Sequence, residues 1–63
     1  MKVKDVIKKM EADGWYYIGT TGDHHKYKKE GRRATAAVAG KPSDEVSPGV
    51  LAQIRRITGI DFR

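Results

Sequence analysis

The chain has 63 residues, no cysteine and a formal net charge of +5 at pH 7. This length allows one small domain over residues 1–63, and without cysteine neither a disulfide framework nor a thiolate metal site can stabilise it. No apolar run approaches the roughly 18 residues needed to cross a bilayer, and the N-terminus lacks the apolar segment of a secretion signal, so we expect a cytoplasmic protein. The positive charge favours a polyanionic partner, with nucleic acid first and an acidic protein second.

The first element expected is an amphipathic helix over residues 3–13. Its apolar residues recur at the three- and four-residue spacing that forms one stripe along a helix. Gly14 follows, where a left-handed conformation ends a helix and lets the chain turn. The stripe consists of Val3, Val6, Ile7 and Met10.

Two short strands joined by a tight turn should come next. Residues 15–20 are rich in β-forming side chains, and Trp15 is most simply a core residue. Gly22 and Asp23 have the properties of a hairpin turn, because glycine tolerates positive φ and aspartate bonds its own following backbone. The second strand is then expected over residues 24–29.

Alternation along that second strand divides its side chains between two faces. We expect the face with Tyr27 to point inward, which leaves His24 outward among lysines. The outward set is His24, Lys26 and Lys28, and the inward set is His25, Tyr27 and Lys29.

A second tight turn at Glu30 and Gly31 leads to a third strand over residues 32–39. Its small inward side chains would let a helix approach the sheet closely. Residues 40–46 have the turn-forming composition of a loop. The inward set of this strand is Ala34, Ala36 and Val38.

A second helix should start at Ser47 and Pro48, because serine suits the N-cap and proline the first helical position. Gly59 followed by Ile60 resembles a Schellman stop. Residues 61–63 are expected to form a tail of uncertain order. The inward stripe of this helix is Val50, Leu51, Ile54, Ile57 and Thr58.

This order of elements predicts an α+β fold, α-β-β-β-α, with a three-stranded antiparallel sheet. Two amphipathic helices and one small sheet share a core only if both helices cover the same face. The other face of the sheet should therefore be open.

His24 is the candidate catalytic residue, since histidine both accepts and donates a proton near neutral pH. The simpler alternative is an exposed histidine on a strand that has no catalytic or binding function. His25 is more simply structural, with its ring near Tyr27. Because the two rings point to opposite faces and no third ligand accompanies them, we expect no metal site.

Four cations are expected to gather beside His24, across the second turn. Each alone is most simply a solvated charge that protects a sheet edge from pairing. Together they predict a phosphate-binding surface. The four are Lys26, Lys28, Arg32 and Arg33.

Several short pieces of the sequence resemble the HicA family of toxins. Gly14-Trp15 together with Gly22-x-His24 at this spacing is the most specific piece, and Ser47-Pro48-Gly49 leading into Thr58-Gly59-Ile60 adds to it. The resemblance covers nearly the whole chain. HicA proteins are small bacterial mRNA interferases that resemble a double-stranded-RNA-binding domain in fold.

The resemblance implies that the protein cleaves RNA without a metal or cofactor and that a HicB antitoxin neutralises it. It places the catalytic histidine at His24, with Gly22, Asp23, Trp15 and Tyr27 in supporting positions. Asp23 stands where the family usually has serine, and its carboxylate can orient His24.

The resulting hypothesis is an endoribonuclease of a type II toxin-antitoxin system. His24 would act as general base on a ribose 2′-OH, with nearby cations stabilising the developing charge. The alternative is a non-catalytic RNA-binding module on the same fold, which reads shape and backbone through its basic face.

Overall fold

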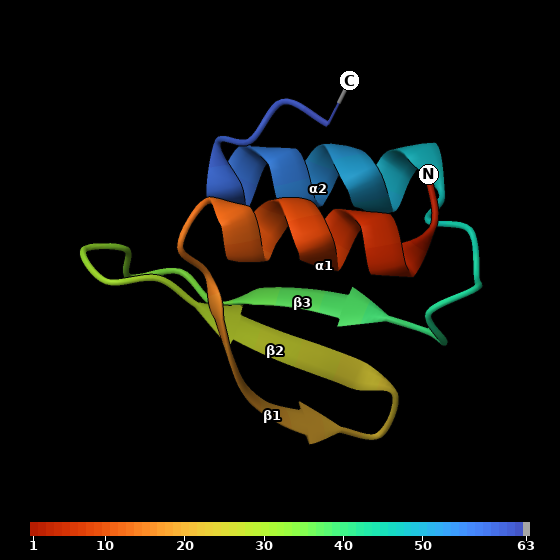
Figure 1. Ribbon diagram of the computed structural model, residues 1–63, viewed down its shortest axis with the longest axis horizontal. Helices are drawn as coiled ribbons and strands as arrows, with labels where there is room; N and C mark the ends of the chain where they lie inside the picture. Colours follow the sequence, from red (N-terminus) through yellow and green to blue (C-terminus); the bar gives the residue numbers. More distant parts are fainter. Residues whose placement is uncertain (63) are drawn as a thin grey trace.

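The computed structural model describes residues 1–62 and confirms the expected α-β-β-β-α order. The three strands form one antiparallel sheet in the order β1-β2-β3, and both helices lie on the same side of it (Figure 1). Within residues 1–62, no helix is long and apolar enough to span a membrane. The elements are α1 (Val3–Ala12), β1 (Tyr16–Thr21), β2 (His24–Lys28), β3 (Ala36–Ala39) and α2 (Pro48–Thr58).

Helix α1 buries the stripe expected from its spacing. Val3, Val6 and Met10 are buried, and Ile7 packs against them at the margin. The helix ends at Ala12, after which Gly14 takes a positive φ of 100°. This backbone conformation favours glycine and turns the chain into β1.

The first hairpin has the expected turn, with Gly22 at a φ of 62°. Tyr17 pairs with Tyr27 near the start of β1, and Thr21 pairs with His24 at the turn. The register shifts by one residue between Tyr17 and Gly19, so β1 carries a β-bulge. Because β2 has no such shift, its side chains alternate without interruption between the two faces.

The third strand is shorter than the sequence predicted. It covers Ala36–Ala39 rather than residues 32–39, and Ala34, expected to point inward, is exposed. The chain instead turns sharply, with the Arg32 amide donating to the Lys29 carbonyl. The Arg32 guanidinium also donates to the carbonyl of Thr58 at the end of α2. These contacts direct the segment toward the helix, so it cannot extend the pairing with β2.

Helix α2 begins and ends where the sequence predicted. Ser47 is the N-cap and accepts a hydrogen bond from the Val50 amide, and Gly59 ends the helix at a φ of 73°. Ile54 and Thr58 are buried as expected. Val50 is not, because it lies at the margin of the buried stripe and is 40% exposed.

One apolar cluster fills the space between the helices and the sheet. The helices pack chiefly on β3, whose Ala36 and Val38 are fully buried, whereas β1 lies farthest from them (Figure 1). Phe62 belongs to this cluster, so the expected tail folds back at this position, while Arg63 lies outside the described residues. The buried apolar side chains are Val3, Val6, Met10, Trp15, Tyr27, Ala36, Val38, Val46, Ile54 and Phe62.

Candidate functional site

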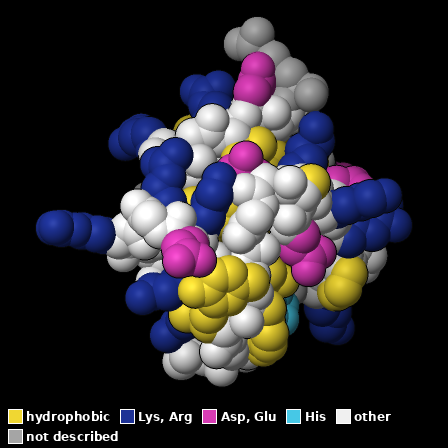
Figure 2. Space-filling model, turned by 60° about the vertical axis from the view of Figure 1, so that its left-hand side comes forward, with side chains coloured by type: hydrophobic (Ala, Val, Ile, Leu, Met, Phe, Trp, Pro, Cys, Tyr) yellow, Lys and Arg dark blue, Asp and Glu magenta, His cyan; other side chains and the backbone are white. Residues whose placement is uncertain are grey.

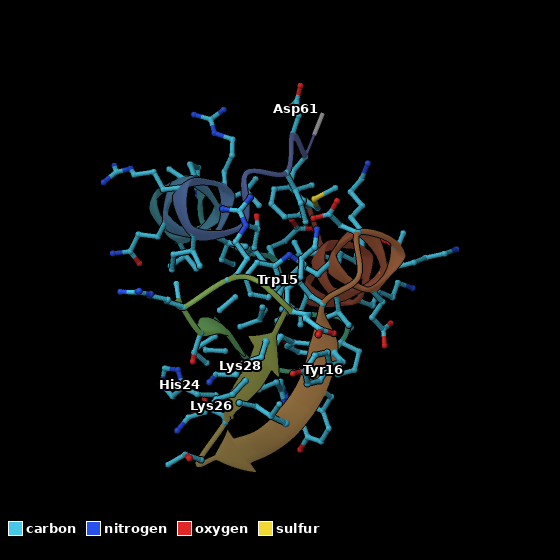
Figure 3. All side chains as sticks on the ribbon, turned by 90° about the vertical axis from the view of Figure 1, so that its left-hand side faces the viewer. Trp15, Tyr16, His24, Lys26, Lys28 and Asp61 are labelled. Atoms are coloured by element: carbon cyan, nitrogen blue, oxygen red, sulfur yellow. The ribbon has the colours of Figure 1, made fainter. Side chains whose placement is uncertain are left out.

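The outer face of the sheet carries a row of three basic side chains on β2. His24, Lys26 and Lys28 alternate with His25 and Tyr27, and Tyr27 is buried beneath the helices. The first three therefore share the opposite, uncovered face (Figure 3). The His24 side chain is 60% exposed, so its imidazole is accessible from solvent. We call His24, Lys26 and Lys28 the basic row.

The strands on either side of the basic row contribute mostly small side chains. Lys26 pairs with Gly19 on β1 and with Ala37 on β3, and His24 pairs with Ala39 on β3. Both alanines are exposed. Because so little side-chain bulk flanks the row, a phosphodiester backbone can approach Lys26 and His24 closely.

Asp23 is the acidic side chain nearest to the catalytic candidate. Its Oδ1 lies 3.9 Å from Nε2 of His24, and both side chains are largely exposed. This separation is too long for a hydrogen bond. Asp23 therefore lies beside the imidazole without being hydrogen-bonded to it.

His25 has a different environment on the inner face. Its Nδ1 lies 3.2 Å from the Thr20 hydroxyl, and its Nε2 lies 3.0 Å from the Gly40 carbonyl oxygen. A carbonyl only accepts, so Nε2 carries a proton and donates to it, while Nδ1 is hydrogen-bonded to the Thr20 hydroxyl. The Thr20 hydroxyl also bonds the Tyr17 hydroxyl.

This histidine also holds the turn beside His24. The Gly40 amide donates to the Asp23 carbonyl at 3.2 Å. Gly40 therefore connects His25, through its carbonyl, to the turn of the first hairpin, through its amide. The ring of His25 thus joins β1, β2 and the end of β3. Its expected structural role is supported, although through hydrogen bonds rather than through packing near Tyr27.

The two arginines lie in the connection between β2 and β3 rather than on a strand. Arg32 donates to the Thr58 carbonyl at 3.4 Å and lies against the end of α2. Arg33 is exposed in the connection between β2 and β3, outside the paired strands. Both arginines were expected on the third strand, and they lie before it because that strand begins only at Ala36.

Two of the residues expected in supporting positions, Trp15 and Tyr27, lie below the row, whereas Gly22 and Asp23 form the turn beside it. Trp15 is buried at the start of β1, and Tyr27 packs edge-to-face against Tyr17 with the ring centroids 5.7 Å apart. The Lys29 ammonium donates to Asp13 at 3.0 Å, and this hydrogen bond lowers the pKa of the Asp13 carboxyl. These contacts fix the ends of β1 and β2 and so the position of the row.

Tyr16 was missed as a functional candidate. It pairs with Lys28 across the open face and is 53% exposed. Figure 2 shows hydrophobic side chains gathered at the lower end of the molecule, at the level of β1. The signal was present in the sequence, because alternation from a buried Trp15 puts the next side chain outward.

Within residues 1–62, no three His, Asp or Glu side chains lie close enough together to hold a metal ion. The site instead offers one accessible imidazole and two ammonium groups on a strand. A basic, uncovered sheet face on a small domain is a feature also found in proteins that bind nucleic-acid backbones.

Comparison with known proteins gives the family. The family model of the HicA toxin of bacterial toxin-antitoxin systems matches residues 3–60, and the chain belongs to this family. A search of curated proteins finds no match.

Proposed function

We propose that this protein is the mRNA-cleaving toxin of a type II toxin-antitoxin system, acting in the cytoplasm as an endoribonuclease that needs no metal. One observation carries the proposal. An exposed imidazole, His24, lies on the same open strand face as two ammonium groups, those of Lys26 and Lys28. Family membership agrees with this assignment.

In the proposed reaction, His24 takes the proton of a ribose 2′-OH. The 2′-oxygen then bonds to the adjacent phosphorus, the bond to the 5′-oxygen breaks, and that oxygen takes a proton from water. Negative charge increases on the phosphoryl oxygens as the reaction proceeds. Lys26 and Lys28 stabilise that charge from the same face, while Asp23 stabilises the imidazolium that forms.

The neutralising partner is proposed to be a HicB-like antitoxin. An inhibitor that covers the basic row would remove both the base and the phosphate contacts at once. Acidic side chains on such a partner would match the charge of the row and speed the encounter.

The test uses purified protein and a defined RNA in EDTA. We expect the wild type to cut the RNA and His24→Ala to bind it with unchanged affinity without cutting it. A matched substrate with a 2′-deoxyribose before the cleaved bond should stay intact, because it lacks the nucleophile. Equal cutting by the two proteins overturns the assignment of His24.

The alternative is a non-catalytic RNA-binding module. One observation favours this alternative. Among residues 1–62 no side chain hydrogen-bonds the His24 ring to hold it in a catalytic orientation, because Asp23 lies 3.9 Å away. Salt-sensitive binding without cutting by the wild type would establish this alternative.

A further inference from the structure

Tyr16 presents an aromatic ring beside the basic row. It pairs directly with Lys28, so the two side chains share the open face of the sheet. More than half of the Tyr16 surface is exposed, although the ring is large and apolar. An exposed aromatic ring next to a cation, on a surface that already carries two more basic groups, calls for a ligand with both apolar faces and negative charge.

We propose that Tyr16 is a stacking site for an unpaired base of single-stranded RNA. This site rests on the ribonuclease function proposed above. Every nucleobase has a flat face that stacks on an aromatic ring, and the phosphate beside it lies within reach of an ammonium group. Tyr16 and Lys28 provide these two groups as cross-strand neighbours.

The position of Tyr16 sets the register of the RNA on the sheet. Lys28 and His24 are four residues apart on β2, which corresponds to roughly 13 Å at about 3.3 Å per residue. A base stacked on Tyr16 therefore lies a short run of nucleotides away from the bond that His24 attacks. In this arrangement Lys26 contacts a phosphate between the two points.

The other exposed apolar side chains of β1 do not provide the same site. Tyr17 faces the opposite side of the sheet, where it packs edge-to-face on Tyr27 and bonds Thr20. The cross-strand neighbours of Lys26, midway between Tyr16 and His24, are the small residues Gly19 and Ala37. A flexible single strand can follow this path, whereas a rigid duplex cannot unstack a base onto Tyr16.

Binding is measured in the His24→Ala background, so that the RNA stays intact. The probe is a short single-stranded RNA with 2-aminopurine at one position, and its affinity and fluorescence quenching are recorded. Tyr16→Phe keeps the aromatic face and should bind like the parent. Tyr16→Ala should bind roughly 5- to 150-fold more weakly and lose the quenching, with an unchanged salt slope.

Two further variants separate stacking from charge and from misfolding. Lys28→Ala should reduce the salt slope by about one phosphate contact. Tyr16→Leu keeps a large apolar side chain without an aromatic ring and should lose affinity as Tyr16→Ala does, which decides the matter if Tyr16→Ala fails to fold.

Three outcomes overturn the stacking site. The first is equal affinity of Tyr16→Ala or Tyr16→Leu and the parent, while the parent still binds RNA. The second is that Tyr16→Ala loses as much affinity for an RNA that lacks the base at the probed position as it does for the complete RNA. The third is a Tyr16 variant that no longer binds a HicB-like partner but binds RNA with the affinity of the parent. A parent that binds no RNA overturns the ribonuclease proposal as well, and cutting by the wild type tests that proposal separately.

Discussion

His24 and His25 are adjacent in sequence and have opposite surroundings. His24 projects from the open face with one carboxylate 3.9 Å away, and both ring nitrogens of His25 are hydrogen-bonded on the inner face. An accessible ring can exchange protons with a ligand, whereas a ring with two fixed partners cannot do so without breaking a hydrogen bond. The same residue type is therefore open to a ligand at one position and part of the structure at the next.

Replacing His25 by phenylalanine should destabilise the fold. Phenylalanine keeps an aromatic ring, but the Gly40 carbonyl loses its donor and the Thr20 hydroxyl loses one of its two partners, so we expect the free energy of unfolding to fall by about 1–3 kcal/mol. Urea denaturation measures this change. The matched control is His24→Phe, which should shift the free energy by no more than about 0.5 kcal/mol because its side chain is exposed. Equal losses in the two variants would contradict the role given to His25.

Tyr27 should make the fold sensitive to alkali. Burial raises the pKa of the Tyr27 phenol, and the nearby Glu11 and Tyr17 add to the effect. A phenol whose pKa is higher in the folded than in the unfolded state stabilises the fold fully below the unfolded value of about 10. This stabilisation is lost as the pH rises through the folded value. Tyr27→Phe should therefore show a weaker fall in the free energy of unfolding above pH 10, and identical pH profiles would refute the prediction.

The helices and the first hairpin were predictable because their signals are local. A cap, a positive-φ glycine and an apolar stripe each act within a few residues, as Ser47, Gly59 and Gly22 illustrate. The third strand was predicted too long because its start depends on a distant contact. Arg32 bonds the Thr58 carbonyl, 26 residues away in sequence, and no alternation pattern reports such a bond.

One glycine inside α2 and one directly after it allow a matched test of the helix stop. Gly59 has a φ of 73°, and a Cβ there would lie 3.3 Å from the Arg32 guanidinium, so Gly59→Ala should cost about 1–2 kcal/mol of stability. Gly49 lies inside the helix with open space around it. Gly49→Ala should therefore raise stability by up to about 1 kcal/mol. Thermal unfolding compares both with the wild type, and changes of the same sign would contradict this account of the stop.

The molecule as a whole depends on a single small core. Trp15, Tyr27 and the helix stripes were predictable as core residues from periodicity, but the inward turn of Phe62 was not, because a lone aromatic residue after a helix stop has no pattern around it. The same limit applies to the site. Alternation predicted the row of His24, Lys26 and Lys28, whereas the bond between His25 and Gly40 joins strands whose approach only the folded chain defines.

Phe62→Ala should therefore remove a large part of the total stability. The side chain is only 8% exposed and packs in the core, so we expect a loss of about 3–5 kcal/mol. A domain of this size has a total of roughly 3–9 kcal/mol, at about 0.05–0.15 kcal/mol per residue. Val50→Ala is the control, since Val50 is 40% exposed and should change stability little. Chemical denaturation of both variants decides the point, and a loss below about 1 kcal/mol for Phe62→Ala would show that the residue is not part of the core in solution.

The uncovered side of the sheet has a consequence for control. His24, Ala37 and Ala39 are exposed, and both helices lie on the other side, so the described part of the chain has no lid over the imidazole (Figure 1). Such a surface is ready as soon as the chain has folded, without any rearrangement. For the proposed ribonuclease, control would then come from outside the described part of the chain, through the amount of an occluding protein and the rate at which that protein is degraded.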